Sequence, residues 1–521
     1  MRRRMRVRMR GRPLASVVLA AAGAALLATR PVGSDDSVPE AAAAAAAAAV
    51  VDDLAQLQRA MLAGGAEDRR AVLCKTVAGL GNRIQGIISC LALAVATRRA
   101  LVVQWEREIS TTPPHANGLM PCGLDDVIAF PDGLDLNESR AYERGDEARA
   151  QVVEAYVSQM VLRSGRGPSW GDLLLCTNLT HVLKHTPVLA VPAWRWMPEI
   201  LSNAAYRDTM ERLFSAGRSG PRGADPPAFY RTVAPLFIRP APAVVAAAAA
   251  LRRYWPGHAR AIGLQVRVGL DTDNEAETQH FFTPAKMWRS WLRCAYSALS
   301  VLGSPEPAAH NAPPAGAEAG PEVWFIAADS TEVKVAMLLQ LAREEGGVVA
   351  EMNLARVATP SQRDALLQGM TPGRRASSSE QERARGVQIP GTGHAWVDDG
   401  LAPVVVDFAS GVRLVFFGRD ASRVGCEDVQ AAMLEMHVLS WSRVLVASHL
   451  STFAALPAAS VAPAGIYHVN RDGDCFNALS LDPLSDAGDL FRTAECFSER
   501  HVVHHSWSRP RRRSVRQTRR Q

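Results

Sequence analysis

Short apolar runs bounded by turn-forming residues recur along this chain, and stretches with helical periodicity lie between them. Runs of about four to eight apolar residues are typical of strands buried inside a sheet. Five such runs predict strands, namely Ala100–Trp105, Ile262–Val268, Val323–Ala328, Leu414–Phe417 and Val444–Ala447. Strands that alternate with helices favour parallel sheets. We therefore expect an α/β protein with one sheet before and one after about residue 250, forming two domains that face each other across a cleft.

Two stretches carry the amphipathic pattern of helices. A helix from about Arg83 places on one face Ile84, Ile87, Ile88, Leu91 and Val95. A helix from Glu427 does the same with Val429, Ala432, Met433, Met436 and Leu439. This spacing of three and four residues predicts an apolar stripe that packs on a core.

The first 30 residues have the layout of a targeting segment. Residues 1–12 hold seven arginines and no acidic residue, and the uncharged apolar run Leu14–Ala28 follows. A basic flank before an apolar run is typical of a signal peptide or signal anchor, and the arginines would stay on the cytosolic side. The alternatives are a cleaved signal and an organelle transit peptide. Residues 31–70, with the alanine run Ala41–Ala49, are predicted to form a stem.

Composition and charge narrow the class of protein. The 521 residues are 48% hydrophobic, which excludes a mainly disordered or collagen-like chain. The formal charge is +6, yet residues 1–12 and 509–521 together hold fourteen arginines, so the remainder carries −8. We therefore expect no nucleic-acid partner, with the alternative that the basic ends bind nucleic acid or anionic lipid. The predicted domains are 71–250 and 251–508, followed by a basic tail over 509–521.

The cysteines and two glycosylation triplets agree with a body in the secretory lumen. Eight cysteines without a CxxC pair argue against zinc ribbons and permit disulfides. Cys475 and Cys496 flank a polar C-terminal segment and are the first candidate pair. The triplets begin at Asn137 and Asn178.

Two motifs that contain glycine or arginine could bind an anionic ligand. The first precedes a predicted helix, where free N–H groups suit a phosphate or a sugar hydroxyl, and comprises Gly79, Gly81, Asn82 and Arg83. In the second, the alternation of the strand Ile262–Val268 places Gln265 and Arg267 on one face. Ligands of parallel sheets bind at the carboxyl ends of strands, and an arginine there suits a diphosphate. The alternatives are an ordinary turn and an arginine paired within its own domain.

Two further motifs follow strands. Asp271 and Asp273 have the DxD spacing of some metal sites, but two carboxylates are few ligands for a cation, so we expect a loop role or a general base and no metal. The segment Ser448–Phe453 follows the strand Val444–Ala447, and its hydroxyl and N–H groups would suit a diphosphate or cap a helix. Its candidate donor-binding residues are Ser451, Thr452 and Phe453. His449 beside them is a candidate general base. The absence of GxSxG, P-loop and HExxH motifs argues against a serine hydrolase, a P-loop NTPase and a zincin.

In this order the motifs resemble the plant cell-wall fucosyltransferase family, whose best-known members add fucose to galactose on xyloglucan. The resemblance rests on Cys74-Lys75 with GLGNR (79–83), on IGLQVRVG (262–269), on the strand that ends at Asp329, and on the segment 431–456 with its STF triplet. It covers about residues 71–505, with insertions.

The resemblance implies a GT-B-like fold of two Rossmann-like domains, GDP-fucose as donor, inversion at the anomeric carbon, and no metal or other cofactor. It also implies a single-pass type II Golgi membrane protein, attached through its N-terminal anchor, and an acceptor that is a galactosyl residue of a cell-wall polysaccharide or glycan. The alternatives are a catalytically inactive lumenal glycan-binding relative and a core-type or protein O-fucosyltransferase.

The resemblance also assigns roles to the candidate residues. Arg267 would bind the donor diphosphate, with Gln265 on the same face. The loop at the cleft would consist of Gly79, Gly81, Asn82 and Arg83. The nucleotide would be held from the other side by Ser451, Thr452 and Phe453. The candidate catalytic residues are Arg267, Asp271, Asp273 and His449.

Overall fold

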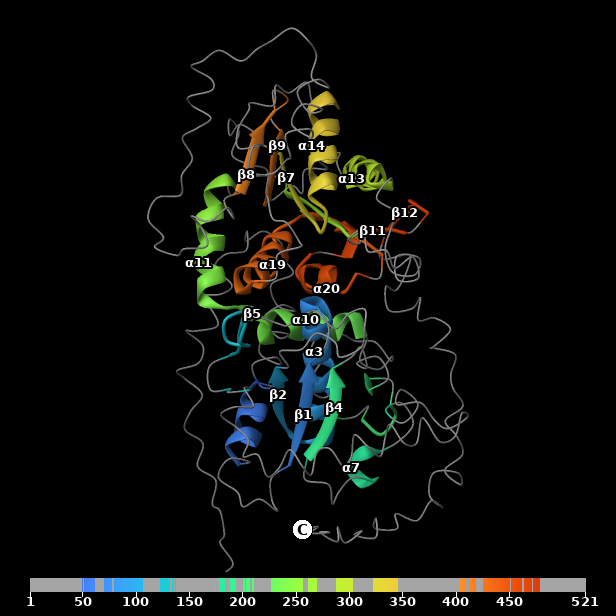
Figure 1. Cartoon of the computed structure of the whole chain (residues 1–521). Coiled ribbons are helices and arrows are strands. Elements are labelled where there is room, and N and C mark those ends of the chain that lie inside the picture. The colour runs from blue at the N-terminus through green and yellow to red at the C-terminus, as the bar shows by residue number, and fades with distance from the viewer. Residues whose placement is uncertain are drawn as a thin grey trace, which may run out of the picture.

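The computed structural model is an α/β structure with two main sheets (Figure 1). It describes residues 49, 51–60, 70–76, 79–105, 122–131, 134, 136, 174, 178–182, 188–193, 200–201, 203–206, 209, 226–255, 261–268, 287–302, 322–344, 403–408, 410, 412–417, 425–449, 451–461, 463–470 and 472–477. The predicted anchor, the arginine-rich tail, Asp271 and Asp273 lie outside the described residues.

The N-terminal sheet has three parallel strands in the order β2-β1-β4. These are β1 (Ala71–Thr76), β2 (Ala100–Trp105) and β4 (Val188–Ala193). Their carboxyl ends point toward the C-terminal half of the molecule (Figure 1). Ligand-binding residues at these ends would therefore face the other half.

Helix α3 (Leu80–Thr97) connects β1 to β2 and is the central helix of this half. It is buried along its whole circumference, and only Asn82 among its residues is not buried. Among the described residues it is the one helix long and apolar enough to cross a membrane, and 94% of it is buried inside the protein. Its apolar surface is therefore covered by protein, as in a core helix.

The folded part begins before Ala71, inside the range predicted as a stem. Residues 51–60 are helical, and Leu54 and Ala55 are buried in the same core as α3. The prediction overlooked these apolar positions because the neighbouring alanine run has no distinct core face. The start of the N-terminal domain therefore moves toward the N-terminus.

Small elements link the two halves. Strand β3 (Ile128–Ala129) pairs antiparallel with β5 (Arg239–Pro240). Helices α10 (Pro226–Phe237) and α11 (Pro242–Leu251) complete this region, whereas α7 (Leu179–Val182) lies at the far end of the N-terminal half (Figure 1). A short 3-10 turn, Arg252–Tyr254, then leads toward the second sheet.

The C-terminal sheet has seven strands in the order β12-β11-β10-β6-β7-β9-β8. The central five are parallel: β6 (Ala261–Val266), β7 (Glu322–Ala328), β9 (Val412–Phe417), β10 (Val444–Ser448) and β11 (Ile466–Val469). The antiparallel edge strands are β8 (Pro403–Asp407) and β12 (Cys475–Asn477). The five predicted strands are thus confirmed as β2, β6, β7, β9 and β10, with ends shifted by at most two residues.

The order of the five parallel strands defines where this sheet can bind a ligand. Along the sheet they run third, second, first, fourth and fifth in chain order, which is a doubly wound topology. The chain reverses its direction of growth between β6 and β10. Loops therefore leave this switch point toward opposite faces, and ligands bind in the crevice they leave at the carboxyl ends.

Helices cover both faces of this sheet. Helices α13 (Arg289–Leu302) and α14 (Thr331–Glu344) pack on one face and share its core. Helices α19 (Cys426–Leu439) and α20 (Thr452–Ala458) lie on the other face. The core on that side is continuous with the core around α3, because α20 packs directly against α3 (Figure 1).

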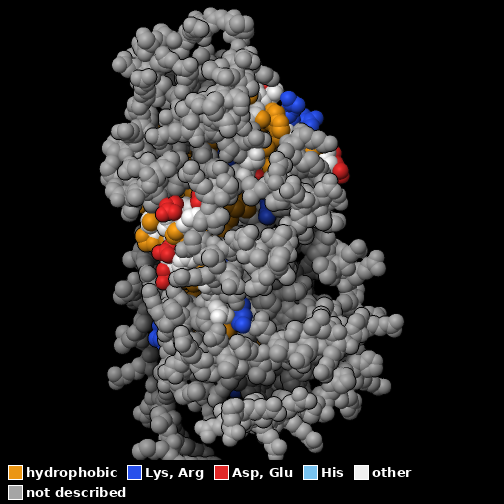
Figure 2. Space-filling view, viewed as in Figure 1, with side chains coloured by type: hydrophobic (Ala, Val, Ile, Leu, Met, Phe, Trp, Pro, Cys, Tyr) orange, Lys and Arg blue, Asp and Glu red, His pale blue; other side chains and the backbone are white. Residues whose placement is uncertain are grey.

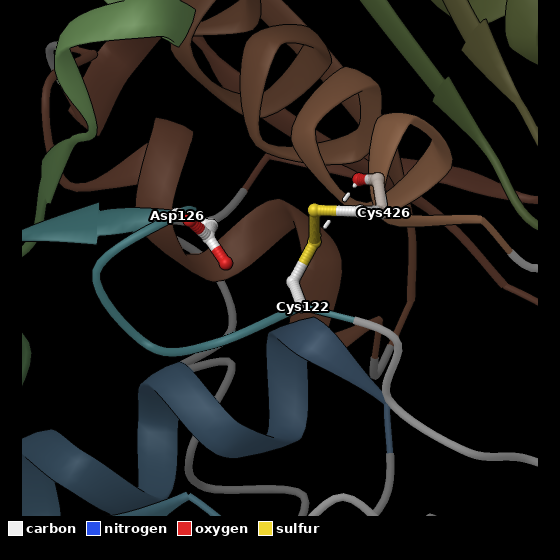
Figure 3. Close-up of side chains that lie close together, drawn as sticks. All are labelled: Cys122, Asp126 and Cys426. Atoms are coloured by element: carbon white, nitrogen blue, oxygen red, sulfur yellow. Dashed lines mark hydrogen bonds between the residues drawn. A yellow bond between two sulfur atoms is a disulfide. The ribbon is translucent and has the colours of Figure 1, made fainter.

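Three disulfides connect described residues. Cys74 bonds Cys90 between β1 and α3, while Cys122 bonds Cys426 and joins the N-terminal half to the start of α19 (Figure 3). Cys475 bonds Cys294, so the predicted pairing of Cys475 with Cys496 is wrong. The edge strand β12 lies beside α13, with the two Cα atoms 5.4 Å apart, and this neighbour is distant in sequence.

Candidate functional site

Gln265 and Arg267 meet Ser448 at the switch point, where β6 and β10 end. The Arg267 N–H donates to the Ser448 hydroxyl over 2.7 Å, and that hydroxyl donates to the Gln265 carbonyl over 3.4 Å. The Gln265 side-chain oxygen accepts the Ser448 N–H over 3.2 Å. We call these three residues the crevice group. Their mutual bonds fix two strand ends at the place where a doubly wound sheet binds ligands.

Arg267 is the cation of the crevice group, and its side chain is partly exposed. Burial lowers the pKa of Arg267, and the Asp329 carboxylate at the end of β7 acts against this effect. An arginine remains protonated in proteins, so the guanidinium can attract an anion. Asp329 also accepts the Val268 N–H over 3.0 Å, which ties the segment after Arg267 to β7.

The first and fourth motifs come together where α3 meets α20. A Cβ atom added to Gly81 would lie 2.7 Å from the Phe453 nitrogen and 2.9 Å from the Thr452 carbonyl oxygen. Gly81 therefore permits close approach of the chain's own backbone. Gly79 is exposed, with no other atom within 4 Å of such a Cβ. We call the contact of Gly81 with Thr452 and Phe453 the junction.

Asn82 and Arg83 follow Gly81 in the first turn of α3 but have different surroundings. Asn82 is partly exposed, whereas Arg83 is 0% exposed. The Arg83 guanidinium donates to the Thr76 hydroxyl over 3.0 Å and lies 4.7 Å from the centre of the Trp105 ring. It thus connects the ends of β1 and β2 beneath the loop, and its predicted contact with the donor stays a prediction.

Ser451, Thr452 and Phe453 form the start of α20, directly after the crevice group. Ser451 occupies the N-cap position but makes no capping hydrogen bond, and its buried hydroxyl oxygen has no partner among the described residues. Thr452 is buried, and Phe453 is partly buried. Plain capping therefore does not account for the Ser451 hydroxyl.

His449 lies in a cluster of rings at the edge of the sheet. Its ring centre is 5.9 Å from that of His468 on β11 and 5.3 Å from that of Phe476 on β12. Burial lowers the pKa of His468 to about 4, and the neighbouring His449 adds to this effect. Neither ring nitrogen of His468 has a hydrogen-bond partner among the described residues. His468 is therefore neutral at physiological pH.

One group of described residues has the spacing of metal ligands, namely Cys122, Asp126 and Cys426 (Figure 3). Both sulfur atoms belong to a disulfide and therefore offer no thiolate to a metal. The Asp126 carboxylate accepts the Gly123 N–H over 2.9 Å, which accounts for one of its oxygens. This group joins the two halves of the molecule.

Other surfaces of the described residues show fewer features of a ligand-binding site. An open pocket of about 370 Å³ lies beside β3 and is lined largely by apolar side chains, including Ile128, Phe130, Leu136 and Pro242. None of the crevice group lines it. On the face shown in Figure 2, the acidic and basic side chains of the described residues occur in small separate groups.

Asp329 was not predicted as a site residue, and Ser448 belongs to the fourth motif but was given no role of its own. Each is the polar residue at or just after the end of an apolar strand, β7 and β10. In the sequence, only this position could indicate that they belong to the site. Their hydrogen-bond partners, Arg267 and Val268, follow a different strand, β6, and are distant in sequence.

Comparisons with known proteins find similarity only among solved structures. No family model and no curated protein sequence matches this chain. An arginine-to-lysine mutant of Arabidopsis thaliana FUT1 in complex with GDP matches with a TM-score of 0.46 and 13% identity, covering 82% of this chain and 78% of that one. The Bradyrhizobium fucosyltransferase NodZ matches with a TM-score of 0.38 and 13% identity, covering 78% and 98%. POFUT1 in complex with GDP matches with a TM-score of 0.31 and 9% identity, covering 76% and 95%.

Proposed function

We propose that this protein is a fucosyltransferase that transfers fucose from GDP-fucose to a galactosyl residue of a cell-wall polysaccharide or glycan, with inversion at the anomeric carbon. The observation that carries the proposal is the crevice group, which presents the Arg267 cation at the switch point of a doubly wound sheet. The choice of fucosyl transfer and of GDP-fucose as donor is supported by the order of the sequence motifs, including IGLQVRVG and the STF triplet, which resembles that of plant cell-wall fucosyltransferases.

The reaction needs an acceptor oxygen, a base and a stabilised leaving group. The acceptor hydroxyl oxygen forms a bond to the anomeric carbon while the bond from that carbon to the diphosphate oxygen breaks. The hydroxyl proton passes to a base, for which the candidates are Asp271, Asp273 and His449, and GDP departs with the electron pair. The Arg267 guanidinium would stabilise the charge that develops on the diphosphate, without a metal.

The remaining donor contacts belong to the residues around the crevice group. Gln265 and the segment Ser451–Phe453 would hold the nucleotide, with Asn82 and the Gly79 loop facing it from the N-terminal half. The unpartnered Ser451 hydroxyl supports this arrangement, because a buried polar group without a partner carries a free-energy cost that a bound ligand can remove.

We place the protein in the Golgi membrane, in the type II orientation, with its catalytic part in the lumen. Three disulfides among the described residues support this, since disulfides persist in the oxidising secretory compartments. The basic segment and apolar run at residues 1–30 would anchor the chain. Immunolocalisation of the full-length protein, combined with protease protection of its C-terminal end, tests the compartment and the orientation.

Calorimetric titration of the full-length protein with GDP and then GDP-fucose tests the donor site. We expect binding that EDTA does not change and that Arg267→Ala weakens by about 10- to 150-fold, since a hydrogen bond to a charged group contributes about 1.5–3 kcal/mol. The matched control is Arg413→Ala. Arg413 lies at the amino end of β9, where it pairs with Asp407, so its loss leaves the crevice group intact.

Two results would contradict the proposal. A folded wild-type protein that binds no GDP would exclude this donor, and equal affinity in Arg267→Ala would remove the diphosphate role of the crevice group. Transfer of labelled fucose to a xyloglucan oligosaccharide then tests the acceptor. Donor binding without transfer to this or to N-glycan and protein acceptors would favour the inactive lumenal relative.

A further inference from the structure

The β6–β10 ladder ends before the residue that carries the crevice cation. The last paired residues are Ala447 and Gln265, and β6 itself ends at Val266. The Arg267 amide is the first donor beyond the strand. Beyond this pair the ladder between the two strands does not continue, and the Arg267 N–H donates to a side chain instead.

The Ser448 hydroxyl takes the place of the missing ladder partner. It accepts the Arg267 N–H over 2.7 Å and donates to the Gln265 carbonyl over 3.4 Å, so one side chain holds both ends of a three-residue segment. Ser448 is only 3% exposed, and its own N–H donates to the Gln265 side chain. A buried hydroxyl with both its donor and acceptor functions satisfied holds one rotamer, which fixes the backbone that it bonds.

We propose that Ser448 is a positioning residue that sets the backbone of Arg267, and through it the direction of the guanidinium toward the donor diphosphate. This inference rests on the proposed function. Ser448 acts through Arg267, since its hydroxyl is used by the two backbone groups of the β6 end. Directional contacts are sensitive to such support, since in enzyme sites a misplacement of about 1 Å can lower the reaction rate about 100-fold.

The test compares Ser448→Ala with Ser442→Ala by GDP titration of the full-length protein. Ser442 is a second buried serine, located just before the amino end of β10, away from the crevice group. We expect Ser448→Ala to weaken GDP binding about 10-fold, the equivalent of one hydrogen bond, and Ser442→Ala to leave it unchanged. Ser448→Thr keeps the hydroxyl and should recover most of the affinity.

A double-mutant cycle separates positioning from a direct contact with the ligand. In the Arg267→Ala background, Ser448→Ala should have no further effect on GDP affinity, because the residue it positions is gone. A full 10-fold loss in that background would show that Ser448 contacts the ligand itself and would overturn the positioning role. Unchanged affinity of Ser448→Ala in the otherwise wild-type protein would overturn it as well.

Hydrogen exchange distinguishes failure of this inference from failure of the proposed function. Without ligand, Ser448→Ala should raise the exchange rate of the Arg267 amide at least about 10-fold, while Ser442→Ala should not. If the wild-type protein binds no GDP, the proposed function fails, and this exchange measurement still decides whether Ser448 fixes the strand end. An unchanged rate in Ser448→Ala would overturn the inference regardless of the GDP result.

Discussion

The crevice group and the junction both derive from short motifs with glycine or arginine after a strand, yet their surroundings differ. In the crevice group, Arg267 is partly exposed and its backbone N–H donates a hydrogen bond to the Ser448 hydroxyl. At the junction, Gly81 packs against the backbone of α20, and the neighbouring Arg83 is entirely buried. The first arrangement presents a charge, whereas the second closes the contact between two halves of the molecule.

This difference shows that an arginine after a strand is not in itself a ligand-binding residue. Arg267 follows the last residue of β6, and its side chain is partly exposed. Arg83 lies in the first turn of a helix that is buried all round, where Thr76 and Trp105 surround its guanidinium. The junction should therefore respond to changes mainly in stability, and the crevice group mainly in donor affinity.

The largest effect should come from removing the disulfide that joins the two halves. The double substitution Cys122→Ser with Cys426→Ser opens a link between residues 304 positions apart, for which loop entropy predicts a loss of about 5 kcal/mol. The pair Cys74 and Cys90 closes only 16 positions and should cost about 3 kcal/mol when replaced in the same way. Thermal unfolding followed by fluorescence measures both.

The contrast between the crevice group and the contacts that join the two halves predicts that this double substitution leaves donor affinity nearly unchanged. The crevice group lies wholly within the C-terminal sheet, so GDP affinity should remain within about three-fold below the new unfolding temperature. A large loss of GDP affinity in a folded Cys122→Ser/Cys426→Ser protein would show that this link between the two halves shapes the crevice. An unfolding temperature equal to that of the Cys74→Ser/Cys90→Ser protein would contradict the predicted order of the two disulfides.

The sequence could predict the strands because a buried parallel strand is a local pattern. Ala100–Trp105 was predicted with the bounds of β2, whereas the strand Ile262–Val268 was extended two residues too far. The apolar alternation continues through Val268, but the amides of Arg267 and Val268 bond to side chains of Ser448 and Asp329. A one-dimensional pattern cannot distinguish a ladder bond from a side-chain bond.

The contacts that decide the roles of the motifs are not local. Arg83 is enclosed by residues of β1 and β2, and Cys475 meets Cys294 through the packing of β12 on α13. The spacing of residues along the sequence predicts neither of these contacts, because each depends on the order of the strands in the folded sheets. Within the described residues, the first motif meets the fourth at the junction, and the second meets Ser448 in the crevice group.

Acid should destabilise the crevice side of the molecule through His468. Its pKa of about 4 in the folded protein lies below the ordinary 6.5, so the unfolded chain binds more protons between these values. The free energy of unfolding is therefore highest above pH 6.5, where His468 is neutral in both states. It falls by about 3 kcal/mol as the pH is lowered toward 4. Urea unfolding at several pH values measures this slope.

The substitution His468→Gln removes this titration and should flatten the stability profile between pH 6.5 and 4. His181→Gln is the control, because His181 is an exposed residue on α7 and its replacement should leave the slope unchanged. Equal slopes for the wild-type and His468→Gln proteins would contradict the assignment of acid sensitivity to this buried ring.

The smallest predicted effect is a difference in stability between alanine substitutions at the two glycines of one motif, Gly81 and Gly79. Gly81→Ala places a Cβ within 2.7 Å of the Phe453 nitrogen, a backbone atom that can move only with α20, so we expect a loss of about 1–3 kcal/mol. Gly79→Ala meets no atom within 4 Å and should change stability by less than about 0.5 kcal/mol. Because Ser451–Phe453 is proposed to hold the nucleotide, a shift of α20 should also weaken GDP binding a few-fold in Gly81→Ala alone. Equal stability and affinity in the two variants would mean that the junction tolerates displacement, and that the role of Gly81 at the contact between the halves has been misassigned.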